Sequence, residues 1–242
     1  MMADHRLADA MGRSAYQVMS AVHQRYSEKA EDKFYAMIGA ITTERLDNLD
    51  NQLLDPAEYF MRVCEAKGDY SFIYCAAPRS EVIGRCWRPV AGQIPPVISG
   101  LLPYGGGQSG HLKESHLQLD NMCRMSFGTV NPNAIKTINA FLLSNNTISS
   151  PCDFADAILE CLRLRGFSGC GDYLELEDGY FFSQSTLTRS EDIFVAISTD
   201  VRWTYGGPGL LIQSNGTDIN NFCDVGVFIG RYPKTSESIN IG

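Results

Sequence analysis

The first quarter of the chain places its hydrophobic residues at the spacing of an α-helix. A stripe with steps of three and four begins at Ala15 and runs through Val18, Met19, Val22 and Tyr26. Such a stripe predicts an amphipathic helix that buries one face against a core.

Two further helices are predicted before residue 68. The first starts with acidic residues, which favour the positive end of the helix dipole. Its apolar face is formed by Phe34, Ile38 and Ile41. The second helix has a clear start, with Asp55 as the N-cap and Pro56 at the first helical position.

Beyond residue 68 the pattern is typical of strands, with aromatic and β-branched residues in short runs bounded by turn residues. The predicted strands are residues 70–75, 117–127, 173–176, 180–182, 193–197 and 225–229. Glu177-Asp178-Gly179 predicts a hairpin turn. We expect residues 203–209 to be a turn-rich link and the polar tail after Pro233 to be frayed.

One helix is predicted inside the β-rich part. Ser150 and Pro151 mark its start, and Gly166 marks its end. The sequence therefore predicts an α+β fold, with a helical N-terminal part followed by a mostly antiparallel β-rich part with one inserted helix. The expected domains are residues 1–67 and 68–242, the second with a long Pro/Gly loop at 78–110.

Composition narrows the possible functions only a little. The 242 residues carry a formal net charge of −8, which argues against a general nucleic-acid binder. No apolar run approaches the ~20 residues of a membrane-spanning helix. The polar N-terminus lacks the apolar middle of a secretory signal, so we expect a cytoplasmic protein.

The eight cysteines are scattered and form no C-x-x-C pair, and reduced thiols are therefore expected. Two glycosylation sequons, at Asn145 and Asn215, are interpreted as chance matches in the absence of a secretory signal.

No motif identifies a catalytic, cofactor or metal site. His111 and His116 are five residues apart, whereas two zinc ligands on one helix need a spacing of four. The glycine cluster at 105–110 lacks the Lys-Ser/Thr ending of a phosphate-binding loop. We expect no cofactor, and we leave open whether the protein is an enzyme.

The long irregular segment and the stretch after it hold the residues most suited to an interaction surface or a pocket. They are Arg85, Trp87, Arg88, Tyr104, His111 and His116. An aromatic beside an arginine is typical of recognition surfaces. Trp87 can equally anchor the loop by filling the core, and we favour this second interpretation.

The run Glu31–Ile41 resembles a segment near the C-terminal end of fungal HET (heterokaryon incompatibility) domains. Gly68–Ile73, with Trp87-Arg88-Pro89 after it, is similar to the stretch downstream of that segment in some of these proteins. Two upstream HET motifs have no counterpart here. The resemblance therefore implies a C-terminal piece, a truncated form or a diverged relative without the half that is similar to TIR folds.

The sequence leaves three hypotheses. In the first, the chain is a non-self-recognition or cell-death-associated protein that binds a protein partner through residues 68–242. The second is an enzyme with a site between the helical and β-rich parts. The third is a secreted ligand-binding module with disulfides. A pocket with converging ionisable groups would favour the second, and an exposed apolar patch the first.

Overall fold

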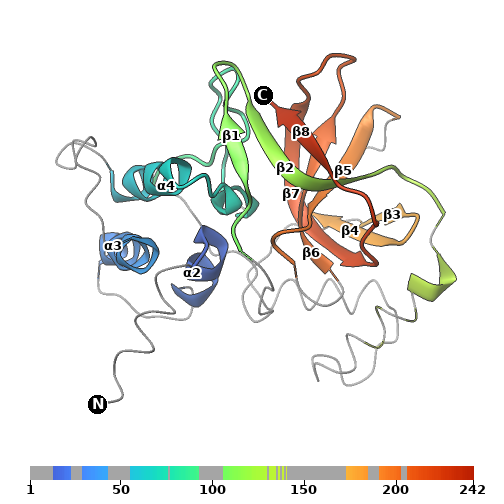
Figure 1. Ribbon diagram of the computed structural model, residues 1–242, viewed down its shortest axis with the longest axis horizontal. Helices are drawn as coiled ribbons and strands as arrows, with labels where there is room; N and C mark the ends of the chain where they lie inside the picture. The colour runs from blue at the N-terminus through green and yellow to red at the C-terminus, as the bar shows by residue number, and fades with distance from the viewer. Residues whose placement is uncertain are drawn as a thin grey trace.

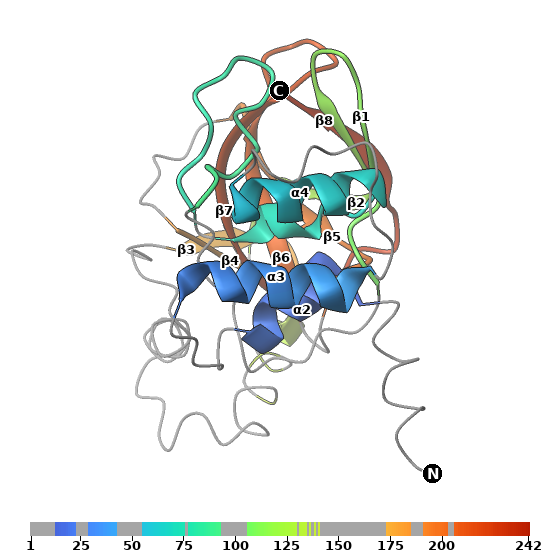
Figure 2. The same ribbon diagram turned by 90° about the vertical axis from the view of Figure 1, so that its left-hand side faces the viewer.

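The computed structural model describes residues 13–22, 29–42, 55–75, 77–92, 106–129, 131–134, 136, 138, 140, 173–184, 191–202 and 206–242. Within these residues most helices come first, a further helical stretch lies within 132–140, and eight strands form an antiparallel sheet, which confirms the predicted α+β class. The predicted helix at 150–166 lies outside the described residues. Figures 1 and 2 show the three N-terminal helices together on one side of the sheet.

Three helices match the predicted ones. They are α2 (Ala15–Val22), α3 (Ala30–Ile41) and α4 (Pro56–Ala66). The predicted N-cap of α4 is confirmed, because a carboxylate oxygen of Asp55 accepts the backbone N–H of Ala57 at 2.9 Å. No helix in the described part of the chain is long and apolar enough to cross a membrane.

Helix α3 turns its predicted apolar face toward the core. Met37 and Ile41 are buried, while Phe34 and Ile38 are partly buried against the same cluster. The ring of Phe34 meets that of Phe60 on α4, with ring centroids 6.4 Å apart. The predicted face is therefore confirmed, although Phe34 lies at the margin of the core.

All paired strands of the sheet are antiparallel, and their order is β1-β2-β5-β6-β7-β4-β3. Strand β8 stands outside this order and also pairs with β2. The strands are β1 (Gly110–Leu112), β2 (Leu117–Met125), β3 (Tyr173–Leu176), β4 (Gly179–Ser183), β5 (Ile193–Ser198), β6 (Gly206–Gln213), β7 (Asn221–Gly230) and β8 (Glu237–Ile241).

The sheet curls until its far end meets the continuation of β2. Phe127, just after β2, forms a bridge with Leu176 of β3. The backbone N–H of Asn131 donates to the carbonyl of Glu177 at 2.8 Å. Nine buried side chains from β2 to β7 form one cluster on the enclosed face. Both faces of the sheet are thus covered, one by its own curl and one by the helices.

Paired glycines allow this tight curl. Gly209 of β6 lies opposite Gly226 of β7, and the ring of Phe181 from β4 covers both. A Cβ on Gly226 would lie 2.5 Å from the nearest ring carbon of Phe181. Glycine is required there because the aromatic ring occupies the space that a side chain would need.

Three predictions were wrong. Residues 70–75 do not form a strand, because Ser71–Tyr74 is a buried 3₁₀ turn, η2. A short apolar run buried on all sides has no period that separates strand from helix. The link predicted at 203–209 already belongs to β6 from Gly206 onward. The tail contains β8, because Ile239 and Ile241 alternate with polar residues and are buried.

We predict different losses of stability for the two rings of the α3–α4 contact. Phe60→Ala removes a fully buried ring and lowers the free energy of unfolding by about 3–5 kcal/mol. Phe34→Ala removes a partly buried ring and costs about half as much. Urea unfolding of both variants measures this difference. Equal losses would mean that α3 packs more deeply than described.

Candidate functional site

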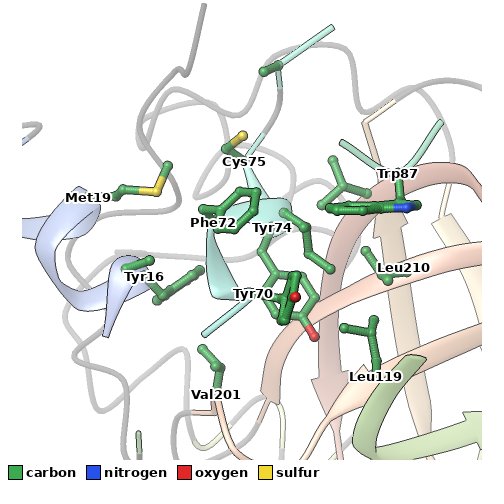
Figure 3. Close-up of a cluster of buried hydrophobic side chains, with 14 of the residues drawn as sticks. Tyr16, Met19, Tyr70, Phe72, Tyr74, Cys75, Trp87, Leu119, Val201 and Leu210 are labelled. Atoms are coloured by element: carbon green, nitrogen blue, oxygen red, sulfur yellow. The ribbon is translucent and has the colours of Figure 1, made fainter. Parts of the chain in front are cut away.

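The turn η2 joins the helices to the sheet. All four of its side chains are buried, and it lies between α2 and the sheet. Figure 3 shows Phe72 and Tyr74 of this turn among Tyr16 of α2 and Leu210 of β6. One continuous buried cluster therefore extends from the helices into the sheet.

The carboxylate of Asp69, just before η2, connects three segments of the chain. Its Oδ2 accepts the backbone N–H of Ala15, the first residue of α2, at 2.6 Å. Its Oδ1 accepts the N–H of Ser71 at 2.9 Å and that of Gln108 at 3.1 Å. A negative charge at a helix start satisfies an orphan donor and favours the dipole. Asp69 thus fixes α2, η2 and the approach to β1 together.

Gln108 continues this network into the core. It is fully buried, and its Oε1 accepts the hydroxyl of Tyr74 at 2.7 Å. Its Nε2 donates to the backbone carbonyl of Asp120 on β2 at 2.7 Å and to that of Ser109 at 3.0 Å. Burial raises the pKa of Tyr74, so its hydroxyl stays a donor at neutral pH. The side-chain amide is therefore satisfied at both ends.

A loop at 77–92 extends from this junction and is closed at its base. Arg79 and Pro89 form an isolated antiparallel bridge across it. The Nη2 of Arg79 donates to the carbonyl of Ile73 at 2.7 Å and to that of Cys75 at 2.6 Å. A guanidinium that takes up the last carbonyls of η2 acts as its C-terminal cap. The loop base is therefore attached directly to the buried turn.

Trp87 anchors the far arm of this loop, as the sequence favoured. The indole is fully buried and meets the ring of Tyr70 edge-on, with centroids 6.1 Å apart. Its Nε1 donates to the carbonyl of Gly84 at 3.3 Å. The side chain therefore belongs to the core, where its N–H still finds a partner.

Arg88 holds the loop to helix α4 by ion pairs. Its Nη1 and Nη2 meet the two carboxylate oxygens of Glu58 at 2.7 and 3.1 Å, and its Nε meets Glu65 at 2.8 Å. Burial alone would raise the pKa of Glu58, but the hydrogen bonds from Arg88 and Arg62 lower it below its ordinary value. Each of the three guanidinium nitrogens donates to a glutamate, and the side chain forms part of the scaffold.

The tip of the loop is a tight turn that exposes aliphatic side chains. The N–H of Arg85 donates to the carbonyl of Val82 at 2.9 Å, and Gly84 has a φ of 80°, as a type II turn requires. Ile83 occupies the outer corner and is 96% exposed, while Val82 is 61% exposed. A Cβ on Gly84 would lie 2.7 Å from the carbonyl oxygen of Ser115.

Ser115 belongs to the turn between β1 and β2, so this hairpin lies against the loop tip. Leu112, the last residue of β1 before this turn, is 42% exposed. Figures 1 and 2 show both segments projecting from the same end of the molecule. We call Val82, Ile83 and Leu112 the loop-tip surface. With Val90 of the same loop, they account for four of the five exposed large hydrophobic residues in the described chain.

The two histidines of the hairpin make separate contacts. His111 has its Nε2 3.4 Å from a carboxylate oxygen of Asp120, whose other oxygen accepts the hydroxyl of Ser238 at 2.7 Å. The Nδ1 of His116 lies 3.3 Å from the hydroxyl of Ser115. No group of three metal-ligating side chains is found among the described residues.

The six candidate residues therefore fall into different places. Arg85 is exposed at the loop tip, and His111 and His116 lie on the adjoining hairpin. Trp87 and Arg88 are buried parts of the scaffold. Tyr104 lies outside the described residues.

Sequence reasoning missed Val82 and Ile83. The available signal was a pair of β-branched apolar residues between Glu81 and Gly84, in a segment with no helical or strand pattern. Adjacent apolar residues within a tight turn have nothing to bury them unless another segment covers them. Here the buried Trp87 and Arg88 fix the loop, and the apolar pair stays outside.

The described cysteines are all free: Cys64, Cys75, Cys86, Cys123 and Cys223. Burial raises the pKa of the thiols of Cys64, Cys75, Cys123 and Cys223. These thiols stay protonated at neutral pH, and a protonated thiol is a weak nucleophile.

Comparisons with known proteins assign no family and no function to the chain. No protein-family model, no curated protein and no solved structure matches the chain.

We predict that Arg88→Met lowers the free energy of unfolding by about 2–4 kcal/mol at pH 7, because Glu65 loses the ion pair with Arg88 and Glu58 keeps only its pair with Arg62. The lowered pKa of Glu58 stabilises the wild type above about pH 4.3, and this stabilisation is lost as pH falls further toward the folded pKa. The difference between the two proteins should therefore shrink in acid.

Urea unfolding of both proteins between about pH 7 and pH 3.5 measures this effect. A constant difference across that range would show that Arg88 does not lower the pKa of Glu58.

Proposed function

We propose that the protein acts through protein–protein contacts made by the loop-tip surface. This role agrees with the non-self-recognition or cell-death function that the resemblance to fungal HET proteins implies. The observation that carries the proposal is the nearly complete exposure of Ile83 at the tip of a loop that is firmly held at its base.

Exposed aliphatic side chains support a binding role when they are concentrated and held rigid. Single exposed apolar residues are ordinary, but here most of the large ones in the described chain lie on one loop and the adjoining hairpin. Anchoring by Trp87 and Arg88 reduces the conformational entropy that the loop would lose on binding. A preorganised apolar tip is suited to fill a pocket on another protein.

The same features favour this proposal over the two alternatives. The junction between helices and sheet is occupied by buried aromatic and aliphatic side chains, and Arg88 is engaged by two glutamates. The free thiols of the described cysteines support a reduced compartment, and hence a cytoplasmic protein. The protein partner, rather than a cofactor or metal, is the expected ligand.

We predict that Ile83→Asp abolishes partner binding without unfolding the protein. The side chain lies in solvent, so the free energy of unfolding should change by no more than about 0.5 kcal/mol. A charge at the centre of an apolar contact should be strongly unfavourable for binding. The readout is growth arrest on overexpression in a fungal host, together with co-purification of the bound protein.

The matched control is Tyr35→Asp, which places the same charge at a 55% exposed aromatic residue on α3. The proposal requires that Tyr35→Asp retains both effects and that Ile83→Asp loses them at equal protein abundance. If the wild type and Ile83→Asp behave alike, or if both variants fail equally, the loop-tip surface is not the binding site.

A further inference from the structure

The loop-tip surface carries opposite charges on its two sides. Glu81 precedes the apolar pair and Arg85 follows it, and both side chains are exposed. Neither forms an ion pair with another residue in the described part of the chain. The tight turn between Val82 and Arg85 fixes the backbone that carries Ile83, with Glu81 just before the turn and Arg85 as its last residue. Among the described residues, the tip therefore has an apolar centre that follows an unpaired anion and precedes an unpaired cation in the sequence.

The adjoining hairpin turn repeats the pattern. Lys113 and Glu114 are both exposed next to Leu112, and neither forms an ion pair with a described residue. The four charges of the two turns sum to zero. A partner with one dominant sign of charge would gain at two of these side chains and lose at the other two.

A second loop tip in the opposite orientation matches the charges of Glu81 and Arg85. In a two-fold symmetric contact, residue i of one copy meets residue j of the other, and j meets i. With the axis at Ile83, the two isoleucines meet at the centre. Glu81 of each copy then faces Arg85 of the other. The arrangement buries the most exposed aliphatic side chain and pairs both free charges.

We propose that the loop-tip surface binds a second copy of this chain in a two-fold symmetric dimer. This inference rests on the proposed function and names the partner of the same surface. Two loop tips cover less than the ~800 Å² per partner of a standard interface. The dimer is therefore weak and forms reversibly with concentration.

Sedimentation equilibrium of the purified chain from about 5 µM to about 500 µM tests this, at low salt to limit screening. We expect the wild type to shift from monomer to dimer across this range, and Ile83→Asp to remain monomeric. Tyr35→Asp is the control that should still dimerise. A wild type that stays monomeric throughout, or a dimer unaffected by Ile83→Asp, would overturn the proposal.

Charge reversal then tests the symmetry. Glu81→Arg and Arg85→Glu should each weaken the dimer on the order of 10-fold, because two symmetry-related pairs become repulsive at once. The double variant restores both pairs with their signs exchanged, and it should dimerise like the wild type. Glu31→Arg, at an exposed residue of α3, should have no effect. Single variants without effect, or a double variant that is not rescued, would contradict the two-fold arrangement.

Failure of the dimer and failure of the proposed function give different results in these assays. If the chain stays monomeric while Ile83→Asp still abolishes growth arrest and co-purification, the surface binds a different protein and only the dimer is wrong. If both assays are insensitive to Ile83→Asp, the surface itself is not a binding site, and the proposed function fails with the dimer.

Discussion

The carboxylate of Asp69 is the interaction on which the rest of the structure depends. It receives backbone N–H groups from α2, from η2 and from the segment that leads into β1. These donors come from parts of the chain up to 93 positions apart (Ala15 to Gln108). One side chain therefore joins segments that are distant in the sequence. Because η2 is buried on all sides, its polar backbone groups need such partners inside the protein.

The loop-tip surface depends on this junction. Arg79 closes the loop against the carbonyls of η2, Trp87 packs on Tyr70 beside it, and Arg88 joins the loop to α4. If η2 moved, these three anchors would no longer fit together. Trp87 and Arg88 look like recognition residues in the sequence, but in the structure they anchor the loop. They hold in place the aliphatic tip, whose residues carry no polar group that would mark them in the sequence.

Sequence patterns predicted the α+β class, α2 to α4 and most strands, because amphipathic helices, caps and alternating strands are encoded locally. They failed at η2, where burial on all sides removes any period, and at β6, where Gly209 lies under the ring of Phe181 and not in a turn. The candidate site was predicted only in outline. The roles of Trp87 and Arg88 depend on distant partners such as Glu58, and the exposure of Ile83 depends on a fold that no local pattern specifies.

The most direct test of this account is hydrogen exchange, measured by mass spectrometry, of the wild type and Asp69→Ala. We predict that the variant loses protection together in α2, η2 and the loop at 77–92, while β5 to β7 keep theirs, because the enclosed face of the sheet does not depend on Asp69. Unchanged protection in α2 and the loop, or a uniform loss across the whole chain, would contradict the claim that this carboxylate holds α2 and the loop-tip surface to the sheet.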